Sequence, residues 1–213
     1  MPVPQSDELL DAMKQVAAIL READVPFALG GGLAAWALGG PPTEHDVDFA
    51  IREADAERAL EALEQAGVRT ERPPEGWLVK AWVDEVLVDL IYRPSGLDVD
   101  DDFFDRCDEL SVAAVRMRVM GADDIFRTKL LALSEHNLDL EPLLSYARAL
   151  REQVDWSEVS AAVESSPFAR TFMFLARELG IVPSPLLHAL PGEAAQAQPA
   201  KAKSSINATS ASG

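Results

Sequence analysis

Two carboxylates one residue apart, Asp46 and Asp48, follow a run of three glycines at positions 30–32. A third acid, Asp89, stands alone in a later apolar segment. Alternate residues of a strand point to the same face, so one metal ion can contact both of the first two carboxylates. Glycines let main-chain N–H groups approach a phosphate without a side chain in the way. Together these residues predict a site where magnesium and a nucleotide phosphate meet.

The chemistry that this set predicts is nucleotidyl transfer, in which two magnesium ions clamp the attacking and leaving oxygens of an in-line displacement at phosphorus. Manganese could replace magnesium, because carboxylate oxygens suit both ions. We expect Asp46 and Asp48 to bind the ion that bridges the phosphates, and Asp89 to hold the second ion or to act as a base. We expect Gly31 and Gly32 to present N–H groups to the phosphates at the start of the following helix.

Each part of this predicted site could also be explained by local structure alone, without a role in function. An Asp-x-Asp pair is common in surface turns, and a run of glycines is most often a turn. Asp89 is harder to explain in this way, because a buried carboxylate without a metal or another partner is costly. A slip of one residue in the strand register would put Asp84 or Glu85 in its place. The order of the glycine turn, the acid pair and the lone acid is what favours a functional site.

Apolar periodicity and glycine or proline breaks predict a mixed α/β part followed by a helical part. In the first part, helices are expected at 6–23, 33–38 and 54–66, and strands at 27–29, 47–51, 68–71, 77–83 and 86–92. The acid run 98–102 is expected to be a solvated loop, 103–107 a short helix or turn, and 112–120 one or two strands. Further helices are expected at 125–133, 142–153 and 168–179, with a helix cap at Asp155.

These elements predict an α/β (α+β) protein with a small mixed sheet flanked by helices and followed by a helical bundle. We expect residues 1–121 to form a catalytic core and residues 122–190 a helical region that completes the active-site cleft. Residues 191–213 are rich in Ala, Gln, Ser and Lys and are expected to be a disordered tail.

The net charge of −17 is spread unevenly along the chain. Residues 1–111 carry 9 basic and 25 acidic side chains, a net charge of −16, whereas residues 112–151 carry 6 and 5, a net charge of +1. Such an acidic surface repels nucleic acid, so any RNA contact must be confined to the middle stretch. A cationic small molecule would instead be attracted to the acidic N-terminal part.

A cytoplasmic protein without a membrane segment is expected. The chain has no apolar run near the ~20 residues that a membrane span needs, and its first residues lack the pattern of a signal peptide. The single cysteine, Cys107, excludes an internal disulfide and is most simply a half-buried thiol.

The pattern of glycine turn, acid pair and lone acid resembles the nucleotidyltransferase superfamily related to DNA polymerase β. The matching segments are residues 29–32, 46–48 and 88–90. The segment 31–49 also resembles antibiotic nucleotidyltransferases that adenylylate aminoglycosides and lincosamides. The resemblance implies that Asp46, Asp48 and Asp89 are the metal-binding and catalytic acids of an enzyme that binds a nucleoside triphosphate such as ATP.

A second resemblance covers residues 121–125 together with Lys129 and Asp139. This arrangement is similar to abortive-infection nucleotidyltransferase toxins and to related bacterial toxins that add nucleotides to the tRNA acceptor end. It implies that Lys129 binds the nucleotide triphosphate and that Asp139 is needed for activity. Without the resemblance, Lys129 is simply a solvated lysine and Asp139 a helix cap.

The preferred prediction is a Mg²⁺-dependent nucleotidyltransferase that transfers NMP from an NTP to the tRNA 3′ end, as a toxin with a neutralising antitoxin partner. An antibiotic nucleotidyltransferase is the alternative, and an inactive nucleotide- or partner-binding scaffold is the second alternative. Five arginines could form a basic strip along an RNA path, or they could be scattered and solvated. They are Arg116, Arg118, Arg127, Arg148 and Arg151. Phosphorylation of Thr43, beside the acids, would block the site.

Overall fold

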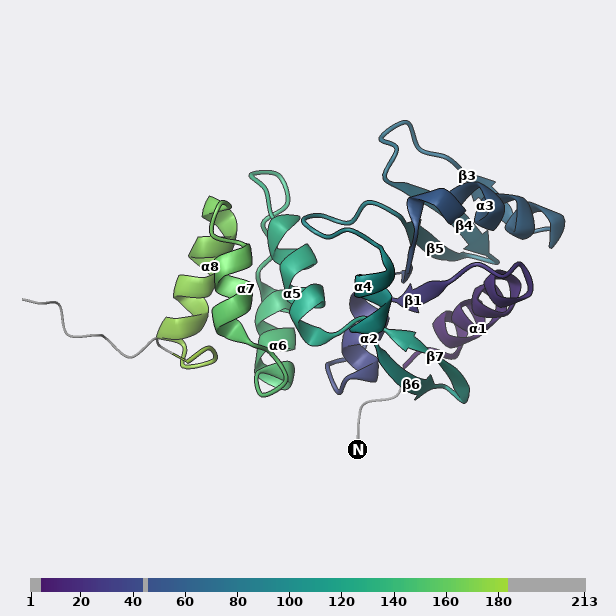
Figure 1. Ribbon diagram of the computed structural model, residues 1–213. Helices are drawn as coiled ribbons and strands as arrows, with labels where there is room; N and C mark the ends of the chain where they lie inside the picture. Colours follow the sequence, from purple (N-terminus) through teal and green to yellow (C-terminus); the bar gives the residue numbers. More distant parts are fainter. Residues whose placement is uncertain (1–4, 44–45, 184–213) are drawn as a thin grey trace, which may run out of the picture. The chain divides into compact units, whose positions relative to one another are not determined.

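A mixed seven-stranded sheet is the scaffold of the computed structural model, which describes residues 5–43 and 46–183. The strand order is β3-β4-β5-β2-β1-β7-β6 (Figure 1). The strands are β1 (Phe27–Leu29), β2 (Val47–Ile51), β3 (Arg69–Glu71), β4 (Leu78–Val83), β5 (Val86–Ile91), β6 (Asp108–Val112) and β7 (Val115–Val119). The central strand β2 pairs antiparallel with β1 and parallel with β5, and the antiparallel pairs β3–β4 and β6–β7 lie at the two edges.

One face of the sheet is apolar and the other carries the acids. Val47 and Phe49 of β2 are fully buried, as are Val88 and Leu90 of β5. Because side chains alternate along a strand, the residue between each apolar pair points to the opposite face. The sheet therefore separates a packed core from a polar face that can bind a ligand.

Two helices cover the apolar face, namely α1 (Asp7–Glu22) and α3 (Ala56–Gln65), which contact each other and strands β2, β4 and β5 (Figure 1). Helix α1 does so because its apolar residues recur at helical spacing. Its buried residues are Leu9, Ala12, Met13, Val16, Ala17 and Leu20. Two short helices lie in the connections, α2 (Gly31–Ala37) and α4 (Asp101–Asp105), and a 3₁₀ turn, η1 (Glu53–Asp55), precedes α3.

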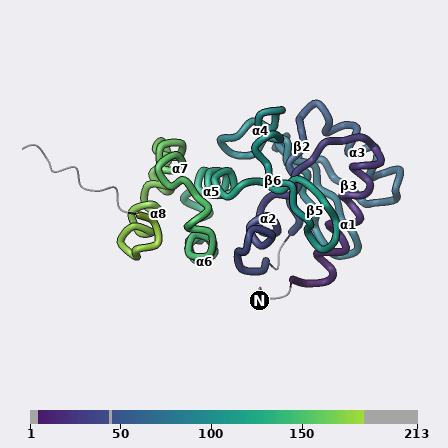
Figure 2. Tube along the Cα trace, turned by 60° about the horizontal axis from the view of Figure 1, so that its bottom comes forward, coloured from purple at the N-terminus to yellow at the C-terminus, as the bar shows by residue number. Residues whose placement is uncertain are grey.

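The last four helices follow one another after the sheet (Figure 2). They are α5 (Ala122–Leu131), α6 (Glu141–Leu150), α7 (Trp156–Ala162) and α8 (Pro167–Glu178). Helix α5 contacts α7 and α8 on one side and α2 on the other, so it joins the helical part to the sheet part. The rings of Phe126 and Trp156 pack with their centroids 4.9 Å apart, and Asp155 caps α7 by accepting two backbone N–H bonds.

The expected fold class is confirmed, with local corrections. The helix expected at 33–38, starting at the glycines, is α2 and begins within the glycine run at Gly31, and Asp108–Val112 forms a strand that its polar residues did not indicate. The acid run 98–102 is not simply a loop, because Asp100 caps α4 by accepting from the Phe103 N–H. The described residues lie in one compact unit, and the division near Gly121 stays a prediction. The expected tail 191–213 lies outside the described residues.

Within residues 5–43 and 46–183, none of the helices has both the length and the apolar character that crossing a bilayer demands.

Candidate active site

Three carboxylates meet on the polar face of the sheet. Asp46 directly precedes β2, Asp48 lies within it, and Asp89 is the register partner of Asp48 on the parallel strand β5. One carboxylate oxygen from each lies within 4.8 Å of the others. The register also excludes the two alternatives at positions 84 and 85, which form the β4–β5 turn. Backbone pairing thus brings together the three acids that the sequence pattern singles out.

Asp89 is the most deeply placed of the three, with 8% of its surface exposed. Its Oδ1 atom is buried and has no hydrogen-bond partner among the described residues. Burial raises the pKa of Asp89 to about 6, the cross-strand Lys80 lowers it, and Asp46 raises it. A buried acceptor without a donor is costly, so this atom calls for a proton or a cation.

Burial and neighbouring carboxylates both disfavour the charged form of Asp48. Burial, and then the charge of Asp46, raise the pKa of Asp48 to about 7, while Lys129 lowers it and Asp89 raises it. Like charges held this close cannot all stay ionised without a counter-charge. Carboxylate oxygens are the ligands that hard divalent cations prefer. The three acids therefore fit a divalent metal ion, on the basis of both their oxygen donors and the orphaned Oδ1 of Asp89.

The glycine turn packs directly against Asp48. The Gly30 N–H donates to the Asp48 carbonyl oxygen at 2.8 Å. Gly31 has a φ of +56°, and a Cβ atom there would overlap the Asp48 carboxylate. Gly31 is therefore required for the close approach of backbone to carboxylate, as well as for the left-handed conformation. Its role toward a phosphate stays a prediction.

Gly32 leaves room for Thr43. A Cβ atom at Gly32 would lie 2.7 Å from the Thr43 hydroxyl oxygen and 2.8 Å from its Cβ. Thr43 is 5% exposed, and its backbone N–H and C=O both bond to the Gln5 side chain. This burial argues against access of a kinase to the hydroxyl, and phosphorylation of Thr43 stays a prediction.

Two side chains of the helical part reach the acids. Lys129 of α5 is partly buried, and its charge lowers the pKa of Asp48. Its Nζ lies 5.4 Å from the ring centroid of Tyr146 on α6. The pKa of Tyr146 is raised by burial, lowered by a hydrogen bond to the Thr43 side chain, and raised by Asp46 and Asp48. Sequence reasoning identified Lys129 but missed Tyr146, for which no local motif gives a signal.

Asp139 is not a member of the three-carboxylate cluster. It is exposed in the connection between α5 and α6, and its carboxylate accepts from the Glu141 N–H at 3.3 Å. This bond satisfies one of the free donors at the start of α6. The structure thus supports a role of Asp139 in capping helix α6, and a catalytic role for it stays a prediction.

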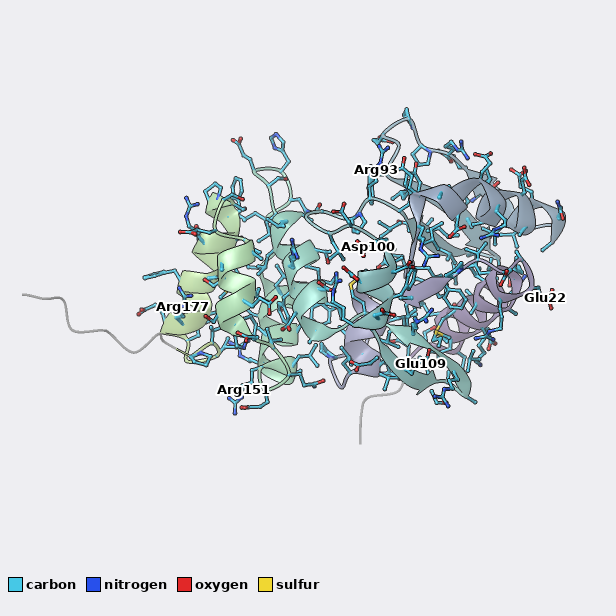
Figure 3. The ribbon with its side chains drawn as sticks, in the orientation of Figure 1. Glu22, Arg93, Asp100, Glu109, Arg151 and Arg177 are labelled. Atoms are coloured by element: carbon cyan, nitrogen blue, oxygen red, sulfur yellow. The ribbon has the colours of Figure 1, made fainter. Side chains whose placement is uncertain are left out.

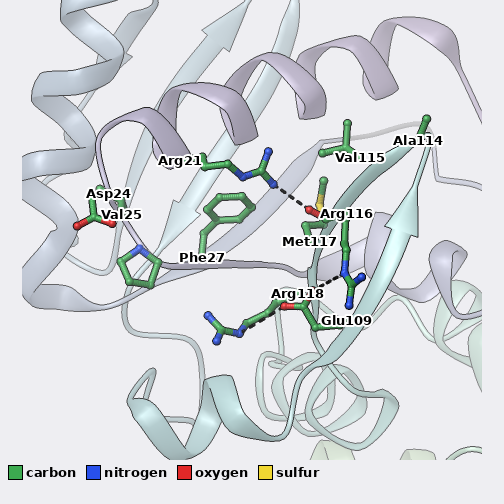
Figure 4. Close-up of a pocket in the computed structure, with 11 residues that line it drawn as sticks. Arg21, Asp24, Val25, Phe27, Glu109, Ala114, Val115, Arg116, Met117 and Arg118 are labelled. Atoms are coloured by element: carbon green, nitrogen blue, oxygen red, sulfur yellow. Dashed lines mark hydrogen bonds and ion pairs between the residues drawn. The ribbon is translucent and has the colours of Figure 1, made fainter.

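The arginines considered for an RNA path are divided between distant parts of the chain. Arg116 and Arg118 flank Glu109 on the β6–β7 hairpin, at 3.2 and 4.0 Å from its carboxylate. They line a groove of about 760 Å³ together with Arg21, which donates to the Arg116 carbonyl oxygen (Figure 4). Figure 3 shows Arg151 in the helical part, well away from Glu109. These arginines do not form one continuous strip.

Comparisons with known proteins agree with this geometry. The family model of aminoglycoside-2″-adenylyltransferase matches residues 12–94, the range that holds the glycine turn and all three acids. No curated protein matches the chain in sequence.

Two solved structures share the fold. The crystal structure of ANT(2″)-Ia in complex with adenylyl-2″-tobramycin is 16% identical, with a TM-score of 0.56 over 76% of this chain and 98% of that chain. The solution structure of the antibiotic-resistance factor ANT(2″)-Ia is also 16% identical, with a TM-score of 0.57 over 80% of this chain and 96% of that chain. The chain thus shares its fold with these two structures, and residues 12–94 match the adenylyltransferase family model.

Proposed function

We propose that the chain is a Mg²⁺-dependent nucleotidyltransferase that transfers NMP from an NTP to a hydroxyl group of a cationic antibiotic, of the aminoglycoside class. The observation that carries the transfer chemistry is the convergence of Asp46, Asp48 and Asp89 within 4.8 Å. The antibiotic acceptor is supported by the family match over residues 12–94 and by the fold shared with ANT(2″)-Ia.

The charge of the chain supports the same acceptor class. The sheet part holds nearly all of the net negative charge, with 9 basic and 25 acidic side chains in residues 1–111. A field of one sign attracts ligands of the opposite sign and repels those of the same sign. An aminoglycoside carries several ammonium groups, whereas an RNA carries a phosphate at every residue. The net charge of residues 1–111 therefore favours the polycation.

In this proposal Asp46 and Asp48 hold Mg²⁺, and Asp89 supplies the third carboxylate of the site. The bound ion would neutralise phosphate charge and favour displacement at the α-phosphorus. Asp89 is our candidate for the proton acceptor, because its Oδ1 is free of partners among the described residues and its pKa of about 6 suits a base at neutral pH.

In the proposed reaction one bond to phosphorus forms, one breaks, and a residue of the site accepts the released proton. The acceptor hydroxyl oxygen forms a bond to the α-phosphorus, and its proton passes to Asp89. The bond from that phosphorus to the bridging oxygen breaks, and pyrophosphate leaves with the electron pair. Lys129 offsets the negative charge that develops on the leaving group. Gly31 and Gly32 allow the main chain to approach the phosphates.

The tRNA acceptor predicted from the sequence, with its antitoxin partner, is the second candidate. Its support is the resemblance that includes Lys129 and Asp139. The structure weakens that support at two points. Asp139 bonds to the start of α6, and the motif residue Asp124 is ion-paired with Arg106 at 2.7 Å. The candidate RNA-binding arginines are divided, as described above.

A labelling experiment separates the candidates. The full chain is incubated with each of the four NTPs labelled at the α-phosphate, with Mg²⁺, and with aminoglycosides, lincosamides or total tRNA. We expect label on an aminoglycoside. Label on tRNA alone would overturn the acceptor assignment, and absence of label from all acceptors would support the inactive scaffold.

The control variants isolate the acid cluster. Asp46→Asn/Asp48→Asn should abolish transfer while the chain stays folded, since Asn keeps the side-chain shape. Asp84→Asn removes one negative charge from the exposed β4–β5 turn, where the φ of +51° suits Asn, and should leave transfer unchanged. Equal loss in both variants would mean that net charge, not the cluster, governs activity.

A further inference from the structure

An ion pair joins the first turn of helix α5 to the chain segment that precedes β6. Asp124 of α5 is 7% exposed, and its Oδ2 accepts a hydrogen bond from Nε of Arg106 at 2.7 Å. Arg106 directly follows α4, and its guanidinium carbon lies 5.3 Å from the ring centroid of the fully buried Phe103. The guanidinium is thus held both by a carboxylate and by an aromatic ring.

The ion pair is one of two polar anchors near the start of α5. Met120, which precedes the helix, donates its N–H to the Leu29 carbonyl oxygen at 2.8 Å, beside the glycine turn. A helix anchored at one end can still change its direction, whereas a second anchor one turn further along fixes that direction. Asp124 supplies this second anchor through Arg106.

Lys129 lies on the same helix as Asp124, five residues further along. Because α5 runs without a break over Ala122–Leu131, the two residues are separated by about 7.5 Å along its axis. The charge of Lys129 acts on Asp48, and its Nζ lies 5.4 Å from the ring centroid of Tyr146. A change in the direction of α5 would therefore move the Lys129 ammonium relative to Asp48.

We propose that Arg106 is a positioning residue, which sets the direction of α5 through its ion pair with Asp124 and so places the Lys129 ammonium for the triphosphate. This inference rests on the proposed function, in which Lys129 contacts the nucleotide. Arg106 acts through Lys129 and not on the reacting atoms. The same pair gives a role to Asp124, which is not a member of the three-carboxylate cluster.

An ion pair that only stabilised the fold would give a different kinetic result. Loss of folded protein lowers the apparent kcat and leaves KM unchanged, whereas a displaced ammonium weakens nucleotide binding and raises KM. Arg106→Leu should raise KM for the nucleotide about 3- to 10-fold, a part of the loss expected when Lys129 is removed altogether. The kcat of the folded fraction should change less than about twofold.

A second variant separates stability from positioning. Arg106→Leu leaves a buried carboxylate without its partner, so it should also lower Tm. Arg106→Leu/Asp124→Asn replaces that carboxylate by a neutral amide and should recover most of the lost Tm, while KM for the nucleotide stays raised. A KM that recovers together with Tm would overturn the positioning role. The double variant gives the same KM test if Arg106→Leu alone does not fold.

A double-mutant cycle with Lys129→Met tests the route of the effect. If Arg106 acts through the Lys129 ammonium, Arg106→Leu should not raise KM further once that ammonium is absent. A rise in KM by the same factor in the wild-type and Lys129→Met backgrounds would overturn the inference, because Arg106 would then act independently of Lys129.

Nucleotide binding gives a readout that does not depend on turnover. In calorimetric titration with Mg²⁺ and α,β-methylene-ATP, Kd should rise in Arg106→Leu by the same factor as KM. Wild-type affinity in this variant would contradict the proposal. A wild-type chain that transfers NMP while the two effects multiply contradicts only this inference, whereas a wild-type chain without transfer to any acceptor contradicts the proposed function itself.

A second ion pair of similar burial provides the matched control. The side chains of Arg58 and Asp55 are 48% and 13% exposed, against 43% and 10% for Arg106 and Asp124. Asp55 keeps Arg52 at 3.8 Å, so Arg58→Leu should stay folded, with the wild-type KM for the nucleotide. Thermal unfolding of every variant verifies that the kinetics come from folded protein. A rise in KM equal to that of Arg106→Leu would refute a role specific to α5.

Discussion

The sheet part and the helical part of this chain supply the site in different ways. The sheet places its acids through backbone pairing, since Asp48 and Asp89 are register partners and Asp46 stands two residues from Asp48. The helical part contributes two long side chains, Lys129 and Tyr146, which reach across from α5 and α6. Backbone pairing fixes a carboxylate closely, whereas a long side chain must be held by its contacts.

The two parts also differ in charge. The sheet brings three carboxylates together, and their burial and mutual repulsion raise the pKa of Asp48 to about 7 and of Asp89 to about 6. The positive charge of Lys129, in the helical part, acts on Asp48, and Lys80 of β4 acts on Asp89. The acids therefore require a counter-charge that these lysines only partly provide. A divalent ion would supply the rest.

The largest expected effect is removal of the metal-binding pair. Asp46→Asn/Asp48→Asn should lower the single-turnover rate by a factor of roughly a thousand or more, because metal stabilisation of the displacement is worth several kcal/mol. Single-turnover transfer of labelled NMP measures this loss. If the double variant keeps more than about a tenth of the wild-type rate, the chemistry does not depend on the sheet part in the way proposed.

The next effect concerns Asp89 as proton acceptor. A base must be ionised, so kcat/KM should rise with pH as Asp89 loses its proton. The pKa of about 6 applies without metal, and a bound cation lowers it, so the rise should lie at or below pH 6. Asp89→Asn should cost about 100- to 10,000-fold and remove this limb of the pH profile. Persistence of the same limb in the variant would assign the proton to another group.

A third test compares the two helical residues that the sequence singled out. Lys129→Met should raise KM for the nucleotide about 10- to 100-fold, since it removes a charge-assisted contact with phosphate. Asp139→Asn should change kcat/KM less than about threefold, because this exposed side chain bonds only weakly to the start of α6. Steady-state kinetics with varied nucleotide measure both. The reverse order of effects would restore Asp139 to the site.

A fourth test addresses the repulsion stored in the sheet. The folded-state pKa values of Asp48 and Asp89 lie above the ordinary value of 3.8, so their protonated forms favour folding. This contribution is complete below about pH 4 and is lost as pH rises through about 6 to 7. In EDTA, Asp48→Asn should therefore raise Tm by about 3–8 °C at pH 8, and by about a third of that at pH 5.

Mg²⁺ should compensate for the same repulsion. Because protons compete with the metal for the carboxylates, the rise in Tm on adding Mg²⁺ should be larger at pH 8 than at pH 5.5. Asp48→Asn should lose most of that rise. A metal-induced shift that is equal at both pH values would contradict binding at these acids.

The fold and the acids could be predicted because their signals are local. Alternating apolar residues around Asp48 and Asp89 show both the strand and the face on which each acid lies. The glycines mark the turn, and only the register between β2 and β5 was needed to bring the acids together. Pairing partners cannot be obtained from one sequence, so the alternatives at Asp84 and Glu85 stayed open until the structure was known.

Contacts between distant segments could not be predicted, because they depend on the tertiary arrangement. Nothing near Tyr146 distinguishes it from any other half-apolar helix residue, and its ring contacts Lys129 on a different helix. Gln5 is equally ordinary in sequence, although its amide bonds to both backbone polar groups of Thr43. Strand β6 was missed for a related reason, since an edge strand with exposed polar residues lacks the apolar alternation of a buried one.

The smallest effect is expected at the β6–β7 hairpin, the edge of the sheet that has no part in the proposed chemistry. Its turn residues Ala113 and Ala114 have φ values of +48° and +69°, a conformation that costs an alanine roughly 1–2 kcal/mol. Asn-Gly suits such a turn, so Ala113→Asn/Ala114→Gly should raise Tm by about 2–6 °C. Transfer activity should stay at the wild-type level, since no described contact links this turn to the acids. A change in kcat would show that the positions of the acids depend on the whole sheet and not only on β2 and β5. The sheet part would then act as one rigid unit up to its edge, in contrast to the helical part, whose side chains are held by individual contacts.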